Sequence, residues 1–158
     1  MQNTVYKGSK GAHMEAIRVK ENWQRAGVYF VRTQAMVRGF QIPLNQEFDE
    51  EDKNDTPYIL ILDGIYPVAT CRLHITQAGE AKIERVCVLE EYRKKGVGKI
   101  MIQAAEAWLK ELGVKHVTIT SRDKAVGFYE ALGYEADWNN TQTGGIFNIV
   151  YTQKSLTD

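Results

Sequence analysis

Several residue types that would define a function by themselves are scarce in this chain. Its 158 residues include two cysteines and three histidines, which is too few for a disulfide framework and lacks the spacing of a metal site. Twenty Lys and Arg balance twenty Asp and Glu, so no overall charge draws the chain to nucleic acid or to an anionic membrane. No stretch is apolar enough for a signal peptide or a membrane span. We therefore expect a reducing, cytoplasmic setting and no metal.

The composition that remains is that of one soluble globular domain. Hydrophobic residues make up 44% and charged residues 25% of the chain, close to the averages for such domains. The segment from Lys7 to Met14 is small and polar, and its His-Met junction is typical of a cloning scar. We predict that residues 1–13 are a tag or a flexible tail and that residues 14–158 form a single domain.

The hydrophobic pattern alternates between the period of strands and that of helices. It predicts strands at 16–20, 58–62, 68–75, 83–88, 114–120, 134–138 and 146–151, and helices at 22–38, 95–112 and 123–132. The acidic segment 46–53 is either a short helix or a loop. Turns at Asp63-Gly64 and Ala78-Gly79 make the second to fourth strands an antiparallel meander. The order of elements predicts a mixed α/β (α+β) fold with parallel and antiparallel strand pairs.

A buried strand, 83–88, leads through a short loop into glycines and a helix. The loop reads Arg93-Lys94-Lys95-Gly96-Val97-Gly98-Lys99. Glycines allow the backbone to approach a phosphate, and the first N–H groups of a helix point toward it. The alternative is a glycine-rich turn before a surface helix. Neither a P-loop nor a dinucleotide fingerprint fits, because Lys99 is followed by Ile100 and only two glycines are present here.

Two motifs, in this order, resemble the signatures of the GNAT superfamily of N-acetyltransferases. Arg93-x-x-Gly96-x-Gly98 is similar to its pyrophosphate-binding motif, and Ala125-x-x-Phe128-Tyr129-x-x-x-Gly133-Tyr134 is similar to its second signature. Ile42-Pro43 followed by an acidic run resembles a subgroup of small bacterial members of undefined acceptor. The resemblance covers 14–151. It implies a mixed sheet of six to seven strands flanked by about four helices, with the fourth and fifth strands splayed around a bulge.

The resemblance also implies acetyl-coenzyme A as co-substrate, bound in the gap between the splayed strands. Its pantetheine would contact the backbone of the fourth strand, and its pyrophosphate would contact the amides that follow Arg93. The residues that the resemblance assigns to the cofactor are Val86, Cys87, Val88, Arg93, Lys94, Lys95, Gly96, Val97, Gly98 and Lys99.

Two side chains are candidate catalytic groups. Tyr129 matches the position at which a phenol would protonate the departing thiolate, and the alternative is a tyrosine that packs on the sheet. Glu84 lies two residues before Val86, on the same face of the strand. Its carboxylate could take a proton from the acceptor amine, or it could pair with a cation such as Arg85 or Arg72.

Other residues have less specific interpretations. The acidic run from Glu47 to Asp52 could steer a cationic amine, although such runs are usually a solvated face. We interpret His74 and His116 as structural and Phe128 as a core residue. Cys87 has no histidine partner at a readable spacing, so we expect a packed residue rather than a nucleophile.

The predicted activity is N-acetyl transfer from acetyl-coenzyme A to a small amine by direct attack in a ternary complex. Three positions differ from the subgroup's usual residues where relatives shape the acceptor pocket or line the cofactor: Arg38-Gly39, Thr120-Ser121 and Phe147-Asn148. They leave the acceptor open. A coenzyme A sensor without turnover and a binding module with a purely structural glycine loop are the alternatives. The sequence also leaves the oligomeric state open, with a homodimer as one outcome.

Overall fold

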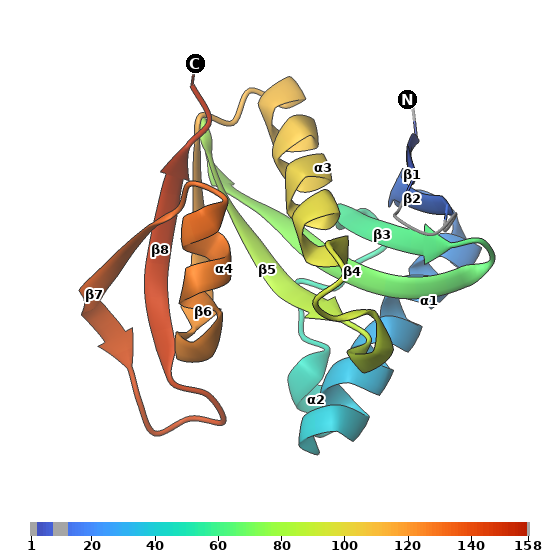
Figure 1. Cartoon of the computed structure of the whole chain (residues 1–158), viewed down its shortest axis with the longest axis horizontal. Helices are drawn as coiled ribbons and strands as arrows, with labels where there is room; N and C mark the ends of the chain where they lie inside the picture. The colour runs from blue at the N-terminus through green and yellow to red at the C-terminus, as the bar shows by residue number, and fades with distance from the viewer. Residues whose placement is uncertain (1–2, 8–12, 158) are drawn as a thin grey trace. The chain divides into compact units, whose positions relative to one another are not determined.

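The computed structural model describes residues 3–7 and 13–157, and their strands form one mixed sheet (Figure 1). The strand order is β1-β2-β3-β4-β5-β6-β8-β7. Pairing is parallel between β5 and β6 and antiparallel in the pairs β2–β3, β3–β4, β6–β8 and β7–β8. The strands are β1 (Thr4–Lys7), β2 (His13–Arg18), β3 (Tyr58–Asp63), β4 (Tyr66–Gln77), β5 (Glu80–Val88), β6 (His116–Arg122), β7 (Glu135–Gln142) and β8 (Ile149–Ser155).

Four α-helices accompany the strands in the described residues, which confirms the predicted fold class. They are α1 (Asn22–Arg32), α2 (Leu44–Glu47), α3 (Val97–Glu111) and α4 (Val126–Ala131). A π-helical segment, Thr33–Arg38, continues α1, so the predicted helix 22–38 changes its hydrogen-bond pattern halfway. The strands β2 to β8 match the seven strands that the sequence predicted, although most boundaries shift, by up to four residues.

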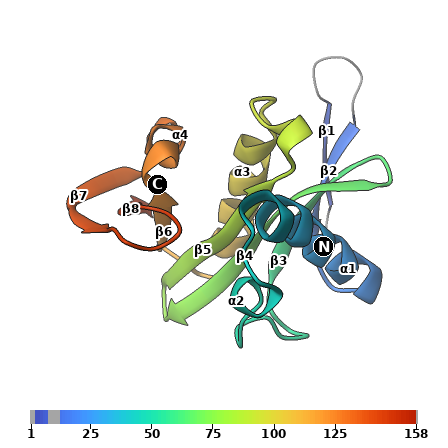
Figure 2. The ribbon, with the colours of Figure 1, turned by 90° about the horizontal axis from the view of Figure 1, so that it is seen from below.

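The chain packs as two compact units, each assembled from separate segments. The first is Met1–Leu73 with Arg85–Ala107, and the second is His74–Glu84 with Trp108–Asp158. In the first unit α1 packs against β3 (Figure 2). In the second unit α4 packs against β6 and β8. That residues 14–158 form a single domain stays a prediction.

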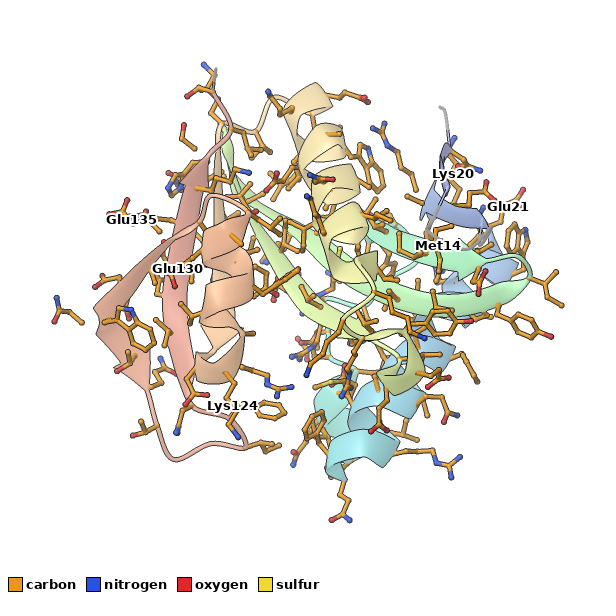
Figure 3. The ribbon with its side chains drawn as sticks, in the orientation of Figure 1. Met14, Lys20, Glu21, Lys124, Glu130 and Glu135 are labelled. Atoms are coloured by element: carbon orange, nitrogen blue, oxygen red, sulfur yellow. The ribbon has the colours of Figure 1, made fainter. Side chains whose placement is uncertain are left out.

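The N-terminus of α1 is capped by a side chain from its own first turn. Lys20 and Glu21 lie at the junction between β2 and α1 (Figure 3). The side chain of Gln24 accepts hydrogen bonds from both backbone amides, at 2.6 and 2.9 Å. This reciprocal cap satisfies amides that the helix itself leaves without acceptors.

The buried face of α1 and its π-helical continuation leaves out two large aromatic side chains. Trp23 and Phe30 are 57% and 45% exposed, whereas Val28, Val31 and Arg32 are fully buried. Positions 24, 28, 31, 32 and 35 form the inward stripe, and its spacing of three to four residues excludes the two aromatic rings.

The predicted tag or tail lies partly outside the described residues, at 1–2 and 8–12. The described segment Thr4–Lys7 pairs antiparallel with β2, from Thr4↔Ala16 to Lys7↔His13. That residues 1–13 are a tag or a flexible tail stays a prediction. No helix in the part of the chain that the structure describes is long and apolar enough to span a membrane, and the cytoplasmic setting stays a prediction as well.

Candidate active site

The parallel pairing of β5 with β6 ends early in β5. It joins Glu80 to His116 and continues only to the pair Lys82–Thr118. Three residues farther along β5, Arg85 has a φ of 52°, a left-handed conformation that residues with a Cβ rarely adopt. The irregular backbone and the short ladder confirm the predicted splay of these two strands.

The loop after β5 turns the chain directly into α3. Leu89 donates a backbone hydrogen bond to the Val68 carbonyl, 2.9 Å away, which fixes the end of the strand. Lys94 and Gly96 then have φ angles of 60° and 81°. An added Cβ at Gly96 would meet no atom within 4 Å. Glycine is therefore favoured there by backbone conformation, and the space beside it is open.

The first turn of α3 has the features of an anion site. The backbone amide of Ile100 donates to the Gly96 carbonyl at 3.2 Å, so the helical pattern starts there. The amides before Ile100 have no acceptor within the helix, and the helix dipole makes this end positive. Val97 is buried and anchors the turn, while the side chains of Lys94, Lys95 and Lys99 are exposed around it. These donors and charges fit a pyrophosphate.

Arg93 links this loop to the strand before it. Its Nε donates to the backbone carbonyl of Val88 at 3.1 Å. The side chain thus braces the turn between β5 and α3. The guanidinium keeps its charge and its other N–H groups, so the exposed Arg93 remains a rim cation beside the three lysines.

Cys87 is packed among apolar side chains. It is buried in a cluster with Val31, Ala35 and Leu89. Burial raises the pKa of its thiol to about 12, so the sulfur stays protonated at neutral pH and is a poor nucleophile. This environment fits the packing role that the sequence suggested.

Glu84 has a partner that the sequence did not suggest. Its Oε1 lies 3.1 Å from Nδ1 of His74. The two side chains come from neighbouring strands and are 28% and 38% exposed, respectively. A carboxylate beside an imidazole can hold a proton and pass it on. The sequence does not connect the two residues, because ten positions separate His74 from Glu84 and no local motif joins them.

Tyr129 is held rigidly in α4. It is 5% exposed, and its ring packs edge-on against Phe128 and Tyr134 with centroid distances of 5.0 and 5.8 Å. Its backbone carbonyl accepts hydrogen bonds from Leu132 and Tyr134 at the end of the helix. Phe128 is 38% exposed, so its prediction as a core residue is wrong.

A buried arginine organises the acidic segment. Arg32 has no exposed surface. Its guanidinium donates to Glu47 Oε1 at 3.1 Å, to the Glu47 carbonyl at 2.6 Å, and to both oxygens of Asp52 at 2.6 and 3.0 Å. The same guanidinium lies 4.4 Å from the ring centroid of Phe48. The sequence interpretation missed this site because an arginine in an amphipathic helix usually faces solvent.

Three acids of the run, Glu47, Asp49 and Asp52, are therefore internal counter-charges to arginines, which the sequence interpretation did not foresee. Burial alone would raise the pKa of Asp52, but hydrogen bonds from Arg32 and Tyr58 outweigh it and hold the pKa well below its usual range. The pKa of Asp49 is lowered too, because the bonds from Arg72 and from the Glu51 amide outweigh burial. Glu50 and Glu51 are exposed to solvent.

The low pKa of Asp52 predicts acid-sensitive stability. Its ion pairs contribute fully above the unfolded-state pKa of about 4, and the contribution is lost as the pH falls through the lower folded-state pKa. We expect the Tm to be nearly constant between about pH 7 and 5 and to drop below about pH 4. Asp52→Asn should lower the Tm at neutral pH and flatten the acid limb, as measured by calorimetry. Asp55→Asn, at an exposed position, is the control, and an unchanged acid limb in Asp52→Asn would contradict the assignment.

Known proteins resemble this chain over most of its length. The model of the acetyltransferase (GNAT) family matches residues 29–134. A Bacillus subtilis (strain 168) protein named as an acetyltransferase is 34% identical over 126 residues, which is 78% of this chain and 85% of that protein. The uncharacterized N-acetyltransferase YjcF of the same organism is 32% identical over 121 residues, with 77% and 85% covered.

Solved structures of proteins named as acetyltransferases also resemble this chain. A protein from Lactobacillus plantarum that carries an N-acetyltransferase name has a TM-score of 0.86 at 28% identity and covers 91% of this chain and 99% of its own. The ribosomal-protein-S18-alanine N-acetyltransferase from Escherichia coli has a TM-score of 0.72 at 15% identity, with 92% and 95% covered. The second likeness shows a shared fold alone.

Proposed function

Because the chain belongs to the GNAT family of acetyltransferases, we propose that it transfers the acetyl group of acetyl-coenzyme A to a primary amine. The observation that carries the proposal is the loop before α3, in which left-handed Lys94 and Gly96 present a helix N-terminus ringed by lysines. That arrangement suits the pyrophosphate of the co-substrate. When bound, acetyl-coenzyme A supplies the activated acetyl group.

In this proposal the chain's own groups bind and orient the two substrates. The backbone amides of Val97, Gly98 and Lys99 bind phosphate oxygens at the start of α3. The backbone of β5 from Val86 to Val88 lines the pantetheine, and one of its N–H groups polarises the carbonyl to be attacked. Because the protein holds both reactants in one site, they do not have to meet in solution, and this proximity provides much of the rate acceleration.

Two side chains carry out proton transfer in this proposal. An amine must be neutral to attack, and we assign the acceptance of its proton to the carboxylate of Glu84, which lies beside His74. The hydroxyl of Tyr129 would donate a proton to the leaving sulfur. Cys87 is buried and protonated at neutral pH, so the acetyl group moves directly from donor to amine without an acyl-enzyme.

The direct test is turnover with a panel of amines. Purified protein, acetyl-coenzyme A and each amine should release free thiol, and mass spectrometry should find the acetylated amine. Thermal stabilisation by acetyl-coenzyme A without turnover of any amine would instead favour the sensor. No stabilisation and no turnover would leave the glycine loop as a structural turn.

Gly98→Leu is expected to weaken acetyl-coenzyme A binding. Gly98 lies in the first turn of α3, where a side chain would occupy the approach of the phosphates, while leucine remains a good helix former. Blocking even one charge-assisted hydrogen bond should raise the Kd by about tenfold or more, as measured by calorimetric titration. Gln103→Leu adds the same side chain at an exposed position of α3 and should leave the Kd unchanged. Equal Kd values for the two variants would contradict the assignment of the first turn of α3 to the phosphates.

Glu84→Gln is expected to lower kcat by about 10²-fold, the lower end of the range for a lost acid–base group. The loss should be greatest at low pH, because fewer amines arrive already neutral there. The matched control is Glu80→Gln, an exposed carboxylate on the same strand. A pH–rate profile of Glu84→Gln parallel to that of the wild type would place the proton acceptor elsewhere.

A further inference from the structure

Arg85 is an arginine in an unusual backbone conformation with few partners. Its φ of 52° places it in the left-handed region within β5. This conformation is unfavourable in free energy and is kept only where the surrounding structure enforces it. Its side chain is 32% exposed. The one side-chain hydrogen bond it makes among the described residues runs from Nη2 to Asp49 Oδ2, at 2.9 Å.

The acceptor of that bond is already saturated. Asp49 Oδ2 also accepts from Arg72 at 3.2 Å, and Oδ1 accepts from Arg72 at 2.7 Å and from the Glu51 amide at 2.9 Å. These contacts with Arg72, Glu51 and Arg85 use the four lone-pair sites of a carboxylate. Asp49 therefore holds Arg85 in place but has no capacity left for a further donor.

Asp52 is saturated in the same way. Its oxygens accept from Arg32, from the hydroxyl of Tyr58 at 2.7 Å, and from the backbone amide of Asp49 at 2.9 Å. A cavity of about 390 Å³ lies against both carboxylates and is also lined by Tyr29, Thr33, Leu44 and Phe48. Every acceptor site of these two carboxylates already has a donor, so an ammonium group in that cavity would lack hydrogen-bond acceptors there.

The spare hydrogen-bonding capacity of this cluster consists instead of donors on Arg85. A guanidinium has five N–H groups, and Arg85 uses one of them. Its Nε is buried and donates to no atom of the described residues, so the donors left for a ligand are the other N–H groups of this partly exposed side chain. We propose that Arg85 binds a carboxylate of the amine substrate, so that the acceptor is an amino acid or another amine that bears a carboxylate.

The position of Arg85 agrees with this substrate class. It follows Glu84, the proposed proton acceptor, and precedes Val86 on the strand assigned to the cofactor. The left-handed φ of Arg85 breaks the alternation that would point neighbouring side chains of a strand to opposite faces, so a carboxylate held by Arg85 can leave the amine of the same small molecule near Glu84. The planar fork of a guanidinium matches a planar carboxylate in two parallel hydrogen bonds. The inference rests on the proposed acetyl transfer and adds the chemical class of the acceptor.

The test compares acceptors that carry a free carboxylate with acceptors that lack one. Initial rates are measured for a series of amino acids, for their methyl esters, and for aminoalkyl phosphates. We expect kcat/KM to favour the best amino acid over its ester by about 10–100-fold, the range for charge-assisted hydrogen bonds. Arg85→Met should remove this preference by raising the KM of the amino acid, with the KM of the ester unchanged. Arg85→Lys, which keeps the charge without the fork, should retain part of it.

Lys82→Met is the matched control, because it removes an exposed cation from the same strand and should keep the full preference. Thermal denaturation of each variant confirms that it is folded. Wild-type protein that acetylates esters as well as amino acids, or prefers the aminoalkyl phosphates, would overturn this inference while leaving the acetyl transfer intact. An Arg85→Met variant with a lower Tm and an unchanged preference would make Arg85 a structural tie to Asp49. Wild-type protein that acetylates no amine would instead refute the proposed function.

Discussion

Tyr129→Phe is expected to lower kcat by about 10²–10⁴-fold, the range for loss of an acid–base group. The substitution removes one hydroxyl and keeps the ring that packs against Phe128 and Tyr134. The fold and the Kd for acetyl-coenzyme A should therefore barely change. The measurement is a steady-state thiol-release assay across pH, combined with a titration of acetyl-coenzyme A into each protein.

Tyr134→Phe is the matched control for this experiment. Tyr134 is 3% exposed and belongs to the same ring cluster, but it is assigned no proton transfer. We expect its kcat to stay within a few-fold of the wild type. If Tyr129→Phe also retained nearly full kcat, water would be the proton donor. If both variants lost activity together with Tm, the cluster would be structural.

Arg32→Leu is expected to destabilise the protein by about 3–5 kcal/mol, the cost of removing one partner from a buried ion pair. Leucine fills much of the volume, but Glu47 and Asp52 would then lie buried without their cation. For a chain of this size the Tm should drop by roughly 10 °C. Urea unfolding at pH 7 measures the change in the free energy of unfolding.

Arg38→Leu makes the same substitution at an exposed position at the end of the π-helical segment. A change of at most about 0.5 kcal/mol is expected there. Arg32→Lys should fall between the two, because it keeps the charge but cannot bond both carboxylates as the fork does. A loss in Arg32→Leu no larger than in Arg38→Leu would show that the buried network contributes little to stability.

Features encoded by neighbouring residues could be predicted from the sequence. The turn from Arg93 to Lys99 has glycine at one of its two positive-φ positions and cations on its rim, and a helical pattern follows at once, so the whole motif lies in one continuous stretch of sequence. The alternation of strand and helix periods likewise predicted a mixed sheet with about the right number of elements. Boundaries were less accurate, because helix and strand ends depend on caps and on pairing with neighbours.

Partnerships between distant segments appeared only with the tertiary structure. Glu84 contacts His74 across two strands, Arg32 contacts Asp52 twenty positions away, and Arg85 reaches Asp49 thirty-six positions away. A charged side chain in a sequence does not reveal whether it faces water or a counter-charge, because that depends on which strands and loops fold over it. The cofactor motif is local and therefore readable, whereas the acidic segment acquires its role only when Arg32, Arg72 and Arg85 fold against it, since ion pairing requires proximity in space.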